Sequence, residues 1–144
     1  MVAAVVEHYR DPGAAYGEVV LARGIGWPAT FFGLVTGFLE KGESVEQGVL
    51  REVKEELGLD GKLGRLIGVY DFKRQNQVII AYHVVVRGGE VVLQTEELEE
   101  YKHVPLFKVT PWREGTGMAV RDFLSFRLPE VAAAEEDSRP ASKL

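Results

Sequence analysis

The chain has 144 residues, which allows one compact domain with little left over. Hydrophobic residues make up 46% of it and charged residues 27%, a balance that excludes collagen-like, low-complexity and wholly disordered proteins. Its 17 Lys and Arg against 22 Asp and Glu leave a net charge of -5, so no basic surface favours a nucleic-acid partner. An anionic substrate would have to be held by a local feature such as a bound cation.

The sequence has no cysteine, which excludes disulfides, thiolate zinc sites and cysteine nucleophiles. No apolar run approaches the ~20 residues that cross a bilayer, so we expect no membrane partner. Residues 1–6 lack the basic start of a secretory signal, and we expect a cytoplasmic protein that begins at Met1. Ser142-Lys143-Leu144 matches a peroxisomal address, so peroxisome or a related organelle is the alternative if the source is eukaryotic.

The first part of the chain predicts short strands separated by turn residues. Residues 3–9 and 18–23 are apolar-rich and flank Asp11-Pro12-Gly13, which predicts a connected strand pair. Residues 31–38 form a further apolar and aromatic stretch. Its two internal glycines indicate bulges or a close approach of the backbone to another group.

The apolar period then changes to that of a helix over residues 44–57. Ser44 followed three residues later by Gln47 is a capping-box pattern, and Gly58 stands where a left-handed C-terminal residue is favoured. Between these ends, apolar residues recur at spacings of three, four and seven: Val45, Val49, Leu50, Val53 and Leu57.

The second half predicts further strands, a helix and a tail. Strand patterns cover residues 62–72, 77–87, 90–93 and 101–109. Gly88-Gly89 predicts a two-residue hairpin turn, so the sheet is at least partly antiparallel. Residues 115–128 are consistent with a second helix. From Pro129 onward the chain is rich in Ala, Glu, Ser and Pro, so we expect a domain over residues 1–128 and a flexible tail over 129–144.

Three glutamates of the predicted helix form an acidic cluster. Glu52, Glu55 and Glu56 stand at i, i+3 and i+4, so their side chains project from one helix face. Crowded like charges destabilise a helix, and near its C-terminal end the macrodipole also disfavours anions. A bound Mg²⁺ would offset this repulsion. Substrate phosphates usually complete the coordination sphere of a Mg²⁺ that carboxylates hold. The cluster therefore suggests phosphate chemistry, although a bare acidic run is more often a solvated helix face.

The segment from Gly37 to Leu59 resembles the Nudix box, whose pattern is G-x5-E-x7-R-E-U-x-E-E-x-G-U, with U a bulky aliphatic residue. A chance match has a probability on the order of 10⁻¹⁰ per starting position. The order of predicted elements is also similar to that of the family. The resemblance implies an α/β fold, the Nudix-type α/β/α sandwich with a mixed β-sheet. Every position of the pattern matches: Gly37, Glu43, Arg51, Glu52, Val53, Glu55, Glu56, Gly58 and Leu59.

The resemblance further implies divalent-metal-dependent hydrolysis of the pyrophosphate bond in a nucleoside diphosphate linked to another group. The catalytic residues would be the three glutamates. Glu52 and Glu56 would be the principal ligands of Mg²⁺ or Mn²⁺, and Glu55 a further ligand or the group that orients or deprotonates the attacking water. The other box residues would be structural, with an ion pair fastening the loop onto the helix: Gly37, Glu43, Arg51 and Gly58.

The substrate stays open among ADP-ribose, NADH and nucleotide-sugar types. The box and the upstream Trp27-Pro28 look most like the NADH diphosphatase branch, but the downstream motif and the four-cysteine zinc ribbon of that branch are missing. Lys73 and Arg74, in a predicted loop, could meet a substrate phosphate, although a solvated basic loop is more common. A Nudix-like module that senses a nucleotide without turnover is the alternative function, and the complete set of box carboxylates favours the enzyme.

Aromatic and acidic residues outside the box are further candidates. Four aromatic residues could stack on a base, although core packing is the more common role of such side chains: Trp27, Phe32, Tyr70 and Phe72. Some members of the family place an additional catalytic glutamate after the last hairpin, where this chain has Glu96, Glu97, Glu99 and Glu100. We expect a small-molecule nucleotide as the binding partner, and a homodimer is left open.

Overall fold

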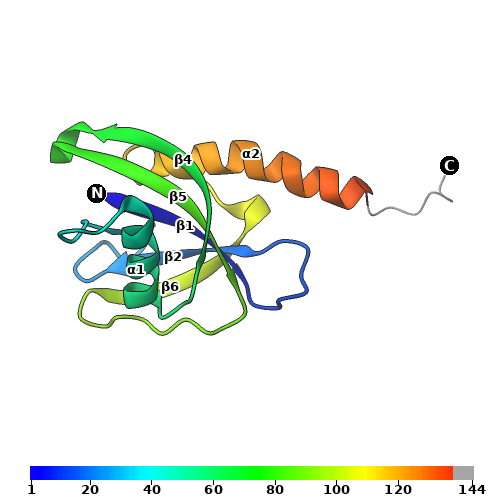
Figure 1. Cartoon of the computed structure of the whole chain (residues 1–144), viewed down its shortest axis with the longest axis horizontal. Coiled ribbons are helices and arrows are strands. Elements are labelled where there is room, and N and C mark those ends of the chain that lie inside the picture. The colour runs from blue at the N-terminus through cyan, green and yellow to red at the C-terminus, as the bar shows by residue number, and fades with distance from the viewer. Residues whose placement is uncertain (138–144) are drawn as a thin grey trace, which may run out of the picture.

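The computed structural model describes residues 1–137, so Ser142-Lys143-Leu144 lies outside the described residues. A six-stranded mixed sheet has one helix on each face (Figure 1). The helices are α1 (Val45–Leu57) and α2 (Thr116–Asp137), with short 3-10 helices η1 (Lys73–Gln75) and η2 (Leu106–Lys108). The strands are β1 (Val2–Tyr9), β2 (Glu18–Gly24), β3 (Val35–Gly37), β4 (Lys62–Phe72), β5 (Gln77–Arg87) and β6 (Leu98–Pro105). The expected α/β/α sandwich is confirmed.

β1 is the central strand of the sheet. The strand order is β4-β5-β1-β2-β6, and the short β3 also pairs with β1. β1 and β5 run parallel, whereas the other four pairs are antiparallel, so the sheet is mixed as predicted. All eight residues of β1 are buried, because a helix covers each face of the sheet.

Alternate residues of β1 enter two separate hydrophobic cores. Ala3 and Val5 belong to the core beneath α2, which includes Phe123. Val2, Ala4 and Val6 belong to the core beneath α1, to which the helix contributes its fully buried side chains: Val49, Val53 and Leu57. This period-two alternation fixes α1 against one face of the sheet, and the glutamates of the box are carried by that helix.

The ends of α1 are those that the sequence predicts. The backbone amide of Gln47 donates to the Ser44 hydroxyl at 3.1 Å, and the Ser44 amide donates to the Gln47 side chain at 2.9 Å. Gly58 adopts a left-handed conformation with φ of 69°, and its amide donates to the carbonyl of Lys54. Both signals are local, so the sequence alone is enough to predict where this helix begins and ends.

The predicted strand at residues 90–93 and its two-residue hairpin are wrong. Gly88 and Gly89 do turn the chain, both with positive φ, but the segment that follows leaves the sheet. Val91 and Leu93 pack against the core beneath α1, so their apolar alternation reflects helix contact and not strand pairing. The next strand is β6, which begins three residues before the expected start at Tyr101 and pairs with β2.

The second helix is longer than the sequence predicts. α2 continues through residues 129–137, with Pro129 inside it and Val131 only 3% exposed in the core. Ala and Glu are strong helix formers, so the composition that suggested a tail also suits a helix end. The expected domain boundary at residue 128 therefore falls within α2. Among residues 1–137, no helix is long and apolar enough to span a bilayer.

Candidate active site

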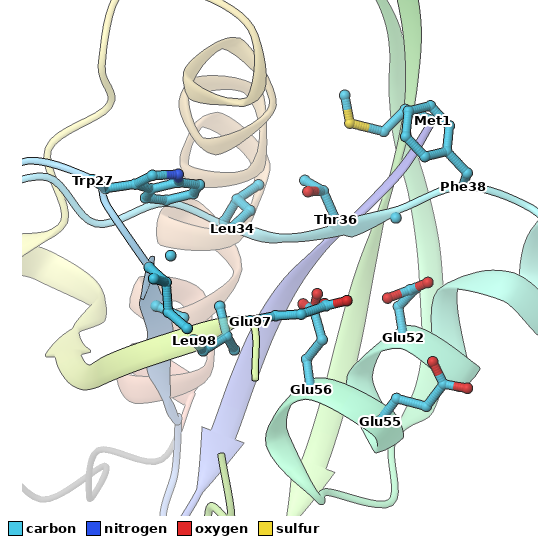
Figure 2. Close-up of a pocket in the computed structure, with 14 residues that line it drawn as sticks. Met1, Trp27, Leu34, Thr36, Phe38, Glu52, Glu55, Glu56, Glu97 and Leu98 are labelled. Carbon is cyan, nitrogen blue, oxygen red and sulfur yellow. The ribbon is translucent and has the colours of Figure 1, made fainter. Parts of the chain in front are cut away.

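A pocket of about 430 Å³ brings together four carboxylates. Glu52, Glu55 and Glu56 enter it from α1, and Glu97 enters from the chain just before β6. Figure 2 shows the carboxylates of Glu56 and Glu97 side by side, with Glu52 near them and Glu55 turned outward. Across the pocket the wall is mainly apolar, with Trp27, Leu34 and Phe38, and Leu98 lies beside Glu97.

Burial and repulsion change the charge that Glu56 carries. Glu56 is 8% exposed, and burial raises its pKa from 4.5 to about 8, with further contributions from Glu52 and Glu97. At neutral pH, without a cation, the carboxyl of Glu56 therefore keeps a proton and can donate it in the hydrogen bond that it makes with Glu97. One proton is shared where two adjacent negative charges would repel each other.

Arg51 connects the box loop to two of the candidate ligands. Its Nε and Nη2 bind the Glu43 carboxylate at 2.6 and 3.0 Å, which lowers the pKa of Glu43. Its Nη1 donates to one oxygen of Glu52 at 2.9 Å and to one oxygen of Glu55 at 3.0 Å. The contact with these two glutamates is not predicted by the sequence pattern. Burial still outweighs Arg51 at Glu52, and the pKa of that carboxyl is raised.

The donor set of the pocket fits a divalent cation in chemistry, although it is not arranged around an ion. Within residues 1–137, no three His, Cys, Asp or Glu side chains already surround a single ion position. Four carboxylates nevertheless line the pocket, and Arg51 takes up only one oxygen each of Glu52 and Glu55. Hard oxygen ligands of this kind suit Mg²⁺ or Mn²⁺. The unbalanced negative charge is what such a cation would neutralise.

Gly37 leaves room for one of these carboxylates. A Cβ at position 37 would lie 2.1 Å from the carboxyl carbon of Glu52 and 2.2 Å from its Oε1. Contacts that short do not occur, so any other residue at 37 would displace either β3 or Glu52. The first glycine of the box therefore lets the β3 backbone approach the carboxylate closely.

The segment of residues 90–97 holds Glu97 against α1. The amide of Val92 donates to the carbonyl of Leu57 at 2.8 Å, and the amide of Gln94 donates to the carbonyl of Glu56 at 3.0 Å. These bonds satisfy carbonyls that the end of a helix leaves open. A Cβ at Gly58 would lie 3.0 Å from the Cβ of Val92, so this glycine also admits the segment. The backbone of Glu56 is thereby tied to the segment that ends in Glu97.

A second cavity, of about 420 Å³, adjoins the carboxylate pocket and is lined by aromatic rings. The two cavities share four lining residues: Met1, Trp27, Leu34 and Thr36. Trp27 and Phe31 are each 41% exposed, and their rings meet edge to face with centroids 5.4 Å apart. Trp112 packs against Phe31 at 6.0 Å, and Phe72 completes the aromatic lining. We refer to this space as the aromatic cavity.

The four aromatic residues that the sequence suggested for base stacking lie in different places. Trp27 and Phe72 reach the aromatic cavity, whereas Tyr70 is 7% exposed with its hydroxyl bound to Asp122. Phe32 is also outside the cavity and lies beneath the cationic ends of Arg23 and Lys102. Phe31 and Trp112 also line the cavity but were not predicted from the sequence, where their only signal is their aromatic character.

The basic and acidic candidates lie at different places in the fold. Of the four glutamates after the predicted hairpin, Glu97 lines the pocket, whereas Glu99 and Glu100 bind Arg23. Arg74 lies at the edge of the aromatic cavity and forms an ion pair with Glu114 at 2.9 Å. Lys73 lies in a neighbouring cavity beyond Arg74. Neither basic residue lines the carboxylate pocket.

The fold and the box define a Nudix-type domain, and comparison of sequences agrees. The family model described as NUDIX domain matches residues 2–123. The chain therefore belongs to the Nudix family. The chain is 34% identical over 123 residues to the NAD-capped RNA hydrolase NudC of Pseudomonas aeruginosa (strain LESB58), covering 85% of this chain and 44% of that protein.

A second relative and two solved structures give the same family and fold. The NAD-capped RNA hydrolase NudC of Stutzerimonas stutzeri (strain A1501) is 33% identical over 99 residues, which cover 67% of this chain and 36% of that protein. The chain thus spans less than half the length of these curated relatives. An ADP-ribose pyrophosphatase from Streptococcus suis 89-1591 superposes with a TM-score of 0.64 at 19% identity, covering 86% of this chain and 89% of that one. A C. elegans Ap4A hydrolase has the same TM-score and identity, with coverages of 88% and 98%. At this identity the two structures establish the shared fold alone.

Proposed function

We propose that this chain is a pyrophosphohydrolase that cleaves a nucleoside diphosphate linked to another group, with a divalent cation as cofactor. The observation that carries this proposal is the pocket in which Glu52, Glu55, Glu56 and Glu97 meet beside an aromatic cavity. Nudix hydrolases in general need a divalent metal. The curated relatives named NAD-capped RNA hydrolase place dinucleotide pyrophosphates among the substrates to be tested.

Glu52, Glu55 and Glu56 are the residues that would hold Mg²⁺ or Mn²⁺. Such an ion, when bound, neutralises charge on phosphate oxygens and lowers the pKa of a coordinated water. Arg51 restrains Glu52 and Glu55 from the side of the box loop. The apolar wall opposite the carboxylates limits the access of water, which strengthens electrostatic interactions in the pocket.

Glu97 is the proposed general base. Without a cation, its carboxylate accepts a hydrogen bond from the protonated Glu56. With the proton of Glu56 replaced by the cation, the Glu97 carboxylate would be available to take a proton from the attacking water. Glu55, whose side chain is 54% exposed and bound by Arg51, is less suited to take the proton of an attacking water.

The aromatic cavity would hold the base of the nucleotide. Stacking on an aromatic side chain contributes roughly 1–3 kcal/mol per base. Because the cavity shares Trp27, Leu34 and Thr36 with the carboxylate pocket, a base held there keeps its attached phosphates near the glutamates. Arg74 also lines this cavity, where its guanidinium group can contact a polar edge of the base.

A non-catalytic module that senses a nucleotide is the second candidate function. Arg51 already binds Glu52 and Glu55, and no ion position is preformed within residues 1–137. Such a module would use the aromatic cavity and leave the pyrophosphate intact. Turnover therefore distinguishes the two candidates, whereas binding alone does not.

The test is a product assay with ADP-ribose, NADH, a nucleotide-sugar, a dinucleoside polyphosphate and NAD-capped RNA, each with Mg²⁺, Mn²⁺ or EDTA. We expect cleavage of at least one substrate, abolished by EDTA. Glu52→Gln should lose at least ~100-fold in kcat with the fold retained, because it removes charge with little change in volume. Glu46→Gln, on the same helix but bound to Tyr82 outside the pocket, is the matched control and should keep its activity. Binding without cleavage across the panel would favour the sensor.

A further inference from the structure

β3 and the residues just before it run from the aromatic cavity to the carboxylate pocket. Gly33 lines the aromatic cavity alone, and Gly37 lines the carboxylate pocket alone, where its backbone lies against Glu52. Leu34 and Thr36, between these two glycines, line both cavities. The order of residues along this segment is therefore the order of the two cavities, and Thr36 lies at their junction.

The side chain of Thr36 faces away from the glutamates. Successive residues of a strand point to opposite faces, and Val35 enters the core beneath α1. Leu34 and Thr36 therefore point away from α1, and Figure 2 shows both side chains on the side of β3 opposite to Glu52. Within residues 1–137, the hydroxyl of Thr36 has no hydrogen-bond partner, and the residue is partly exposed. This hydroxyl is thus available to a ligand.

The junction is otherwise mainly apolar. The other three residues that line both cavities are Met1, Leu34 and Trp27. The indole ring of Trp27 lies against the backbone of β2, where a Cβ at Gly24 would come within 2.7 Å of its Cε2 atom. This contact fixes the ring beside the junction, as a platform for a base. Among the four shared side chains, that of Thr36 alone has a hydroxyl group, which can both donate and accept a hydrogen bond.

The remaining polar groups of the two cavities lie away from the junction. The glutamates of the carboxylate pocket would hold the cation in the proposed function. The other polar side chains of the aromatic cavity do not line the carboxylate pocket, so they suit the base better than the sugar: Arg74, Gln75, Gln77, Glu114 and Thr116. Thr36 is therefore the polar side chain best placed for a group that lies between the two cavities.

The sugar of a nucleotide lies between its base and its phosphates. A base on Trp27 and a pyrophosphate at Glu52 therefore place the ribose at the junction. Ribose hydroxyls lose hydrogen bonds to water in an apolar space, so a protein partner there determines how well the sugar is held. We propose that the hydroxyl of Thr36 forms a hydrogen bond with a ribose hydroxyl of the substrate and thereby favours ribose over deoxyribose. This inference rests on the proposed function, from which it takes the places of the base and the pyrophosphate.

Intrinsic fluorescence can measure this contact. The two tryptophans of the chain, Trp27 and Trp112, both line the aromatic cavity and report a base that enters it. We would titrate the protein in EDTA with adenosine, 2′-deoxyadenosine and 3′-deoxyadenosine, which carry no phosphate and are not repelled by the glutamates. The ratio of the dissociation constants of a deoxynucleoside and adenosine measures the effect of one hydroxyl. We expect one of the two deoxynucleosides to bind about 3- to 10-fold more weakly than adenosine, as for the loss of one hydrogen bond between neutral groups.

Three variants test whether the contact is made by Thr36. Thr36→Val has nearly the same shape but lacks the hydroxyl, so the ratio should fall close to one. Thr36→Ser keeps the hydroxyl and should keep a ratio well above one. Thr116→Val is the matched control, because Thr116 lines the aromatic cavity but not the carboxylate pocket, and it should leave the ratio as in the parent protein.

The outcomes separate this contact from the proposed function. A ratio of one for both deoxynucleosides in the parent protein, an unchanged ratio in Thr36→Val, a lost ratio in Thr36→Ser or an equal loss in Thr116→Val would overturn the contact. If no nucleoside changes the fluorescence, the base site and the contact fail together. If substrates are cleaved and adenosine binds but the ratio is one, the contact alone fails. If the ratio follows the Thr36 variants without any cleavage, the hydrolase proposal fails and the contact stands.

Discussion

Replacement of Glu56 by glutamine is expected to stabilise the metal-free protein at alkaline pH. Burial and the neighbouring carboxylates raise the pKa of Glu56 from 4.5 to about 8. Between these values the unfolded chain releases the proton while the folded chain keeps it, so the free energy of unfolding falls as the pH rises through this window. Glutamine has nearly the same volume, carries no charge and can still donate a hydrogen bond to Glu97.

The size of the stabilisation follows from the pH range between the unfolded and folded pKa values of Glu56. A span of roughly 3.5 pH units, at about 1.4 kcal/mol per unit, gives an upper limit of about 5 kcal/mol at pH 8. Because the pocket can relax and admit water around the ionised group, we expect about 2–4 kcal/mol. For a domain of this size that corresponds to a rise in Tm of roughly 5–12 °C.

The assay is thermal unfolding in EDTA at pH 5 and pH 8, on the parent protein, Glu56→Gln and Glu55→Gln. Glu55 lines the same pocket but is 54% exposed, so its variant is the matched control. Glu56→Gln should gain stability mainly at pH 8, whereas Glu55→Gln should follow the parent protein. Mg²⁺ should then raise the Tm of the parent protein at pH 8 more than that of Glu56→Gln. Equal midpoints for Glu56→Gln and the parent protein at pH 8 would refute this account of the pocket.

Three further variants test other parts of the structure. Gly58→Ala should lower kcat about tenfold with a small loss of stability, because a Cβ at this position crowds the segment that carries Glu97. Steady-state kinetics and thermal melting of the same variant measure the two effects. An unchanged kcat would count against this role of Gly58. Glu7→Gln should lower the free energy of unfolding at pH 7 by about 3–5 kcal/mol, because it leaves Arg127 without its buried partner. Urea unfolding curves measure this loss. Burial alone would raise the pKa of Glu7, but its hydrogen bonds hold the pKa far below 4.5. The difference in unfolding free energy between the parent protein and Glu7→Gln should therefore shrink as the pH falls below 4.5 and persist at higher pH. Trp112→Leu should raise KM about tenfold with kcat nearly constant, and a loss confined to kcat would contradict a role in base binding.

The fold was predictable from the sequence wherever the signals are local. The capping residues Ser44 and Gly58 fix the ends of α1, and β4 and β5 have the predicted bounds. The segment of residues 90–97 was not predictable in this way. Its apolar alternation matches a strand, and only the open carbonyls of Glu56 and Leu57 explain why its amides bond to a helix end and not to a neighbouring strand.

The candidate site likewise has a part that local sequence signals predict and a part that they do not. The three box glutamates could be located because helical spacing places them together, whereas Glu97 could not be distinguished from its acidic neighbours. Its position depends on the pairing of β6 with β2, which places Glu99 and Glu100 beside Arg23. The aromatic cavity is also non-local, because Phe31 and Trp112 come from loops that meet only in the folded chain.

The box glycines explain how mutually repelling carboxylates stay in one pocket without a cation. Gly37 lets a strand backbone approach Glu52, and Gly58 admits the segment that leads to Glu97. These contacts are made by the backbone, so they do not depend on the charge of any side chain. The retained proton on Glu56 then lowers the repulsion that the packing imposes. A cation that displaced this proton would gain the attraction of both carboxylates, so the charge density that weakens the metal-free fold is also what would favour binding of a divalent ion.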